Sequence, residues 1–189
     1  MRSTVYKPAE DSYLLQRHVE RMVRGLVLDM GTGSGIQAIA AARKPEVMRV
    51  VAVDVNPQAL EEARGNASLA GVADKIEFHL SDLFYAVTEK FDYILFNPPY
   101  LPTEPTEPKD EAVKAWDGGL TGAEVIRRFL REAGDHLTPE GRILLVLSSV
   151  TGITIEEIAG DYEVDILEEM PLFFEKLWCV VLRRRAQGA

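Results

Sequence analysis

The run Asn97-Pro98-Pro99-Tyr100 offers two hydrogen-bond acceptors and one aromatic ring. The side-chain oxygen of Asn97 and the backbone carbonyl of Pro98 can accept hydrogen bonds from two N–H groups, and proline has no N–H to compete there. The ring of Tyr100 can lie against a flat group and favours positive charge on its face. The run, with Pro99 as a further contact, therefore suits a planar nitrogen that gains positive charge as it reacts, such as that of a carboxamide.

Carboxylates end two of the predicted strands beside a glycine-rich turn. Asp29 precedes the turn at residues 31–35, whose glycines permit a tight backbone and close approach of a ligand. The turn lacks the G-x-G-x-x-G spacing of a dinucleotide site, and a carboxylate beside it disfavours an anion, so we expect a positively charged ligand. Asp54 ends the next strand, where it can accept hydrogen bonds from both hydroxyls of a ribose.

A third acid follows the third predicted strand. Asp82, or the backbone after it, is expected to face an adenine ring, with Leu83 packing against that ring. An aspartate at a strand end often only caps the next helix, but three in phase at successive strand ends indicate a shared ligand site. None of these groups is expected to titrate between about pH 6.5 and 8.5, so activity should change little over that range.

These residues need a fold that brings strand ends together. Short apolar runs predict buried parallel strands at residues 26–30, 50–55, 76–80, 93–96 and 143–147. Helical patterns occur at residues 9–23, 36–43, 57–70 and 122–137. Because crossovers between parallel strands are right-handed, this order predicts a doubly wound α/β sheet with ligands at the carboxyl ends of its strands.

The end of the chain has a different pattern. A helix at residues 153–159 precedes strands at 162–168 and 176–184, which predict a C-terminal antiparallel hairpin and a mostly parallel sheet of seven strands. With no linker or repeat, we expect a single domain over residues 1–189, with an N-terminal helical segment at 1–24 and a catalytic core at 25–185. In the proline-rich connection after Pro98, Trp116 is expected either to form a wall over a substrate or to fill the core.

Composition narrows the possible functions. The chain has 21 Lys and Arg against 30 Asp and Glu, a net charge of −9, which opposes direct binding to nucleic acid. The basic run at residues 183–185 predicts a solvated tail. Cys179 is the only cysteine and the three histidines lack metal-ligand spacing, so we expect no disulfide and no metal site. Without a signal-peptide core or a membrane-length apolar run, a cytoplasmic protein is expected.

The motifs together resemble a known family. The glycine turn, the strand-end acids and Asn97-Pro98-Pro99-Tyr100 are similar to those of class I S-adenosylmethionine-dependent methyltransferases that modify planar nitrogens. Residues 5–12 and 115–119, with Gly122, resemble the HemK family, and within it the archaeal and eukaryotic branch of translation release factor glutamine methyltransferases. The resemblance extends over about residues 5 to 185.

This resemblance implies a Rossmann-like fold and S-adenosyl-L-methionine as cofactor. It implies cofactor contacts from the first helix, the glycine turn and the strand ends: Ser12, Asp29, Gly31, Gly33, Asp54, Asp82, Leu83 and Asn97. It implies catalysis by Asn97, Pro98 and Tyr100, on the Gly-Gly-Gln glutamine of archaeal-type termination (peptide chain release) factor 1. Glu10 and Asp11 are expected only to complement the positive end of the first helix.

An adenine-N6 DNA or RNA methyltransferase remains an alternative. The exocyclic nitrogen of adenine is also planar, so the same four residues would serve it. Such an enzyme must also extract the base from its stack and bind phosphates, which the acidic charge opposes. A non-catalytic binding protein and an NAD-dependent dehydrogenase are the other classes considered, and the intact Asn97, Pro98 and Tyr100 disfavour the first of these.

A partner is expected at one edge of the sheet. In the usual strand order of this fold, the strand at residues 75–80 lies at an edge, where unpaired backbone groups can bind another chain. Ile76, Phe78 and Leu80 alternate with polar residues, so one side of this edge near Phe78 is expected to stay apolar. The resembled branch implies that a small zinc-binding activator protein binds there.

Overall fold

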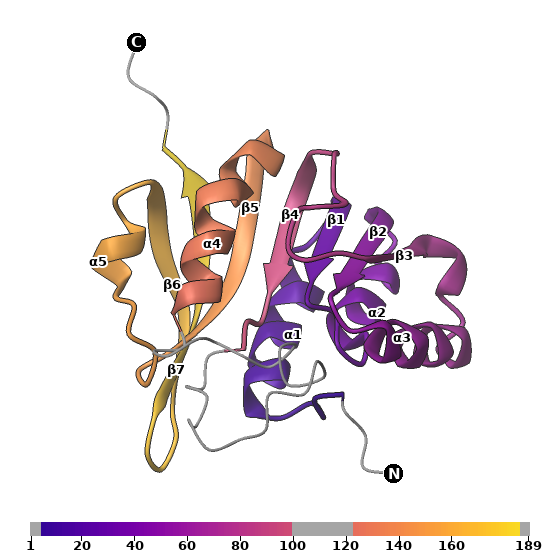
Figure 1. Ribbon diagram of the computed structural model, residues 1–189, viewed down its shortest axis with the longest axis horizontal. Helices are drawn as coiled ribbons and strands as arrows, with labels where there is room; N and C mark the ends of the chain where they lie inside the picture. Colours follow the sequence, from indigo (N-terminus) through magenta and orange to yellow (C-terminus); the bar gives the residue numbers. More distant parts are fainter. Residues whose placement is uncertain (1–4, 100–122, 186–189) are drawn as a thin grey trace.

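The computed structural model describes residues 5–99 and 123–185. They contain one seven-stranded sheet with the strand order β3-β2-β1-β4-β5-β7-β6 (Figure 1). Neighbouring strands from β3 to β5 pair in parallel, whereas β7 pairs antiparallel with both β5 and β6. The predicted doubly wound, mostly parallel sheet with a C-terminal antiparallel hairpin is confirmed.

The elements follow the predicted order. The strands are β1 Gly25–Met30, β2 Val47–Asp54, β3 Ile76–Leu80, β4 Phe91–Phe96, β5 Leu137–Ser148, β6 Tyr162–Pro171 and β7 Lys176–Arg184. The helices are α1 Glu10–Met22, α2 Ile36–Ala42, α3 Pro57–Leu69, α4 Glu124–Ala133 and α5 Ile155–Ile158, with 3₁₀ turns η1 Ala73–Lys75 and η3 Gly134–His136. Within the described residues, no helix is long and apolar enough to cross a bilayer.

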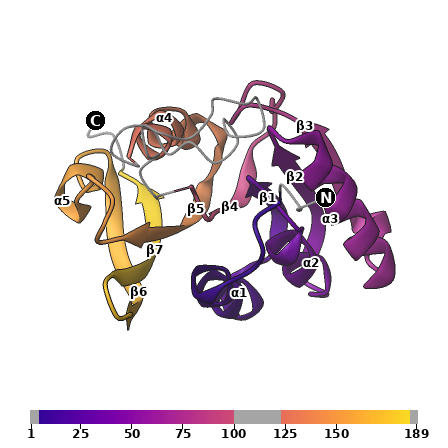
Figure 2. The ribbon, with the colours of Figure 1, turned by 60° about the horizontal axis from the view of Figure 1, so that its bottom comes forward.

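Helices cover both faces of the sheet. Val27 and Leu28 are consecutive in β1, yet they enter opposite cores, because successive side chains of a strand point to opposite faces. One core lies under α1 and α2 and includes the fully buried Leu15. The other lies under α4 and includes the fully buried Phe129. Figure 2 shows the sheet between these two layers.

The chain between α4 and β5 differs from the prediction. The helix predicted to reach residue 137 ends at Ala133, and β5 already begins at Leu137. Phe91 pairs with Leu137 and Tyr93 with Arg142, so a shift in register absorbs the intervening residues of β5. The sequence obscures this strand because Pro139 and Gly141, which usually mark turns, lie within the bulge.

The basic run near the end of β7 is not the solvated tail that was predicted. Arg183 pairs with Glu163 and Asp165 on the neighbouring strand. Arg184 donates a hydrogen bond to the Gly134 carbonyl and forms an ion pair with Asp135 of η3. The antiparallel pairing of β6 with β7 brings Glu163 beside Arg183, so both arginines bind this chain's own groups.

We predict that Gly35→Ala lowers the free energy of unfolding by about 1–3 kcal/mol. Gly35 immediately precedes α2 and has φ of +84°, and an added Cβ would lie 3.0 Å from the Ala63 Cβ and 3.2 Å from the Ala63 Cα of α3. The variant therefore combines backbone strain with overpacking. Gly71→Ala is the control, because Gly71 has φ of +72° but open space around its Cβ position. Urea unfolding should show the larger loss at Gly35, and equal losses would contradict the packing argument.

Candidate active site

The carboxyl ends of β1, β2 and β4 lie side by side at one edge of the sheet. Met30, the last residue of β1, pairs with Val53 of β2 on one side and with Phe96 of β4 on the other. The residues that follow, including Asp54 and Asn97, therefore stand level with the glycine turn. In Figure 1 the arrowheads of β1, β2 and β4 end at this common edge. The structure thus brings together groups that are far apart in the sequence.

Two hydrogen bonds connect the glycine turn to the end of β2. Gly31 and Gly33 have positive φ angles of 64° and 54°, which glycine adopts without strain. The Thr32 N–H donates to the Val53 carbonyl at 2.9 Å, and the Gly33 N–H donates to Asp54 Oδ2 at 2.9 Å. Burial raises the pKa of Asp54, while backbone N–H groups oppose that rise. The predicted contacts Gly31, Gly33 and Asp54 therefore form one surface.

Asp29 is a buried carboxylate beneath that turn. It is 2% exposed, and its Oδ2 accepts hydrogen bonds from Thr32 Oγ1 at 2.6 Å and from the Ala38 N–H at 3.0 Å. Burial raises its pKa to about 7. The expectation that no site group titrates near neutral pH is therefore wrong for this residue. Among the described residues no Lys or Arg pairs with Asp29, so its negative charge suits a cationic ligand.

The first turn of α1 supplies a contact that the sequence-based prediction missed. Asn97 Nδ2 donates to Asp11 Oδ2 at 3.0 Å and lies 3.5 Å from Ser12 Oγ. Asp11 is 3% exposed and also accepts hydrogen bonds from the Tyr6 hydroxyl and from the Ser12 N–H. Asp11 therefore does more than complement the helix end. The acids in residues 5–12, which already carried the family resemblance, were the available signal.

The second polar atom of the Asn97 amide is its side-chain oxygen. Within residues 5–99 and 123–185, this Oδ1 is buried and accepts no hydrogen bond. An unpaired buried acceptor costs about 1–3 kcal/mol, so such a group calls for a functional explanation. Pro98, which follows it, is buried, and Pro99 is partly buried. Tyr100, Trp116 and Gly122 lie outside the described residues, so the roles predicted for them stay predictions.

The turn after β3 makes contacts that the sequence did not predict. The Asp82 side chain is 59% exposed and accepts a hydrogen bond from Arg128 Nη2 of α4 at 2.9 Å. Leu83 is 7% exposed, packs in the core under α4 and has φ of +47°, a strained value for leucine. Ser81 Oγ stabilises this turn: it donates a hydrogen bond to the Leu83 carbonyl at 2.7 Å and accepts one from the Ala86 N–H at 3.0 Å. Contact of Asp82 and Leu83 with an adenine ring remains a prediction.

Residues 7–115 match the protein-family model described as "Methyltransferase small domain". The chain belongs to this family. It is 41% identical to a Methanocaldococcus jannaschii protein that carries the name of a protein N5-glutamine methyltransferase, over 93% of this chain and 90% of that protein. It is 36% identical to the human methyltransferase HEMK2, over 76% of this chain and 72% of HEMK2.

Bacterial relatives are longer than the matched region. The release factor glutamine methyltransferase of Cereibacter sphaeroides is 35% identical over 76% of this chain, and this chain spans 55% of that protein. A solved structure, the E. cuniculi Mtq2–Trm112 complex responsible for the methylation of the termination factor eRF1, gives a TM-score of 0.73 at 26% identity. That match covers 97% of this methyltransferase and 100% of the solved chain. The class I methyltransferase fold is thereby confirmed.

This methyltransferase uses S-adenosylmethionine, and the residues at its site fit that cofactor. When bound, the cofactor supplies a reactive methyl group on a positively charged sulfur. The buried Asp29 carboxylate suits the positive charge, and the partly buried Asp54 stands at the strand end, where a ribose would be held. Gly31 and Gly33, which adopt positive φ angles, have no side chains that would block its approach at these two positions.

We predict that Asp29→Asn stabilises the cofactor-free protein in a pH-dependent way. The folded protein holds the Asp29 proton up to about pH 7, whereas an unfolded aspartic acid loses it near pH 4. Asp29 therefore makes the free energy of unfolding fall as pH rises between these values. Asparagine keeps an acceptor oxygen and cannot ionise. Its advantage over wild type in urea unfolding should grow from about pH 5 to about pH 7 and then level off. An advantage that is the same at every pH would contradict this.

Proposed function

We propose that this methyltransferase modifies the side-chain amide nitrogen of a glutamine in a protein, namely the Gly-Gly-Gln glutamine of an archaeal-type termination factor 1. The observation that carries the proposal is the buried, unpaired Oδ1 of Asn97 at the carboxyl edge of the sheet. The names of the relatives support it, since several act on release-factor glutamines and one solved complex methylates eRF1. A cytoplasmic location remains our expectation, because such factors act on ribosomes.

The chemistry of an amide explains why this acceptor matters. The amide nitrogen shares its lone pair with the carbonyl, so it is a weak nucleophile and becomes positive as its bond to the methyl group forms. Asn97 Oδ1 and the Pro98 carbonyl would hold its two N–H groups and stabilise that charge. One proton then leaves the nitrogen for water. Alignment of nitrogen and methyl group by these two acceptors can lower the barrier by ~7–11 kcal/mol.

The deciding experiment is transfer of labelled methyl groups to a purified archaeal-type termination factor. The proposal predicts incorporation at the glutamine of the Gly-Gly-Gln loop, located by mass spectrometry of the digested factor. The same factor with Gln→Ala in that loop is the control and should take up no label. Label in DNA or RNA with none in the factor would favour the adenine alternative and overturn the proposal.

We predict that Asn97→Ala lowers turnover by about 10²–10³, the effect of losing one preorganised partner of the transition state. Calorimetric titration with S-adenosylhomocysteine serves as the control, because the nearby Asp29 and Asp54 remain in place. Affinity for this product should change little. A variant that loses affinity and turnover in equal proportion would show that Asn97 acts in cofactor binding alone.

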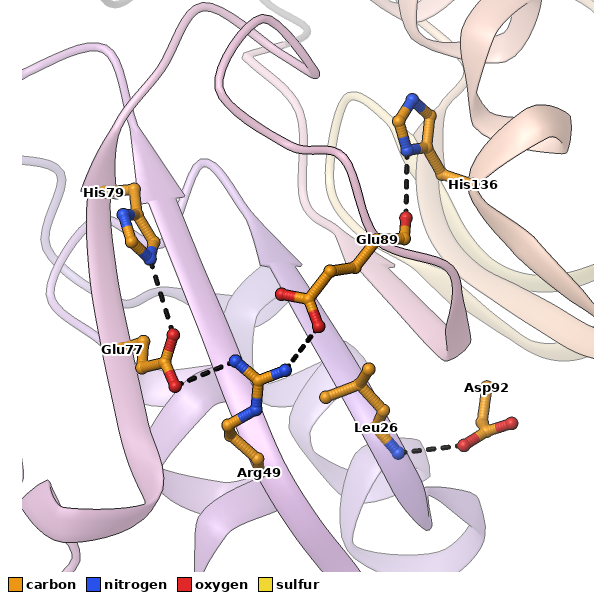
Figure 3. Close-up of polar contacts among 7 residues, drawn as sticks. All are labelled: Leu26, Arg49, Glu77, His79, Glu89, Asp92 and His136. Carbon is orange, nitrogen blue, oxygen red and sulfur yellow. Dashed lines mark hydrogen bonds and ion pairs between the residues drawn. The ribbon is translucent and has the colours of Figure 1, made fainter.

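The β3 edge was predicted correctly, but its exposed face was not. β3 is the terminal strand of the sheet. Its apolar side is covered at Ile76, which is buried, and at Phe78, which packs under the guanidinium of Arg64 in α3, 5.3 Å from the ring centroid. The other side is polar. Figure 3 shows Glu77 and His79 on it, with Arg49 of β2 reaching Glu77 at 2.8 Å.

We propose that the backbone edge of β3, with Leu80 at its end, binds a small activator subunit. Leu80 is 59% exposed, and the Mtq2 of the solved complex is held together with Trm112. Co-expression with such a subunit should raise both yield and activity. Leu80→Glu should remove this gain, whereas Ile166→Glu should keep it, because Ile166 is 51% exposed on the opposite edge strand. Phe78→Glu is a poorer test, since it would disturb α3. A chain that is fully active alone and forms no complex in gel filtration would refute the partner.

A further inference from the structure

We propose that Asp11 is a positioning residue that fixes the amide of Asn97 so that its oxygen, and not its NH₂ group, faces the substrate. The inference rests on the proposed function, in which that oxygen accepts a substrate N–H. Asn97 Nδ2 donates to Asp11 Oδ2 at 3.0 Å, and Asn97 Oδ1 is buried without a partner. One end of the amide is thus held by α1 while the other is kept free.

The carboxylate decides between two orientations that are nearly equal in shape. The oxygen and the NH₂ group of an asparagine differ little in size, so packing alone does not select one of them. An ionised carboxylate only accepts hydrogen bonds. A flipped Asn97 would set its oxygen against the Asp11 oxygen at about the same distance, which is repulsive. The flipped amide would also offer a donor to a substrate nitrogen whose own groups are donors, so it could not bind the amide productively.

Asp11 is itself held rigidly. The Tyr6 hydroxyl lies 3.1 Å from both of its oxygens, and the Ser12 N–H donates to its Oδ1 at 2.6 Å. Burial, followed by the charge of Asp11, raises the pKa of Tyr6, so this phenol remains a donor. Gln37 of α2 fixes the same turn by donating from Nε2 to the Ser12 carbonyl at 2.8 Å. A carboxylate held by two donors on a fixed turn can position its neighbour at little further entropic cost.

The charge of Asp11 also acts through the amide. A carboxylate that accepts from Nδ2 draws the amide electrons toward Oδ1, which makes that oxygen a stronger acceptor. The negative charge then stabilises the positive charge that develops on the substrate nitrogen, by way of Asn97. Asp11 touches neither substrate nor cofactor in this scheme. Its whole effect on the reaction is transmitted by Asn97.

The test is a double-mutant cycle with Asp11→Asn and Asn97→Ala on the termination-factor substrate. Asp11→Asn keeps the volume of the side chain but removes its charge, and we expect kcat to fall about 10- to 100-fold with little change in the KM for cofactor. In the Asn97→Ala background the same change should have almost no further effect, because Asp11 then has nothing to position. Tyr6→Phe should cost less than Asp11→Asn, since the Ser12 N–H still holds the carboxylate.

Two results would overturn the inference. One is full kcat in Asp11→Asn, and the other is a loss in the double variant equal to the product of the two single losses. A purely structural role of Asp11 predicts that second result. Thermal unfolding of each variant checks that it is folded.

A measurement on the wild-type protein does not depend on activity. The side-chain NH₂ signal of Asn97 in an ¹⁵N spectrum, assigned by its absence from Asn97→Ala, should be shifted downfield and protected from exchange by the carboxylate. A freely exchanging signal would refute the contact even if Asp11→Asn fails to fold. If wild type methylates no glutamine, the proposed function fails, whereas this spectrum still tests the contact between Asp11 and Asn97.

Discussion

The parallel pairing of β1 with β2 and β4 is the constraint on which the site depends. Since Met30 is level with both Val53 and Phe96, the three chains leave the sheet together, and the glycine turn meets Asp54 on one side and Asn97 on the other. A slip of one residue in either pairing would turn every side chain of that strand to the opposite face and would separate these groups. The two apolar cores hold the register, because each strand buries side chains on both faces.

The site gathers groups that are unfavourable for stability. Asp29 is a buried acid whose pKa is raised to about 7, Leu83 has a positive φ, and Asn97 leaves an acceptor unpaired. Each costs folding free energy, and such costs concentrate where a protein binds and reacts. A ligand that carries positive charge would relieve the cost at Asp29, and a substrate N–H would relieve that at Asn97. Binding therefore restores interactions that folding leaves incomplete.

Helix α1 completes the site from outside the sheet. Its buried leucines pack against the same core as α2, and Arg17 and His18 bind Glu168 of β6. This packing carries Asp11 to Asn97, a contact that spans 86 residues of sequence. The polar side of β3 is less buried than the site, since the side chains of Glu77 and His79 are about half exposed there. The end of β4 is thus fixed by contacts with α1, while β3 leaves a strand edge open to a partner.

The sequence alone predicted the architecture of the sheet and the polar residues at the ends of β1, β2 and β4. Continuous apolar runs, helical patterns and the glycine turn are local signals, and they predicted the sheet and the gathering of Asp29, Asp54 and Asn97. Local signals do not predict which residues, distant in the sequence, a side chain contacts in the folded protein. Only the tertiary structure revealed that Asp82 binds Arg128, that helix α3 covers Phe78 of β3, and that Asp11 holds Asn97. These outcomes depend on burial and on contacts between distant residues, which fix both the pKa of a carboxyl and the orientation of an amide.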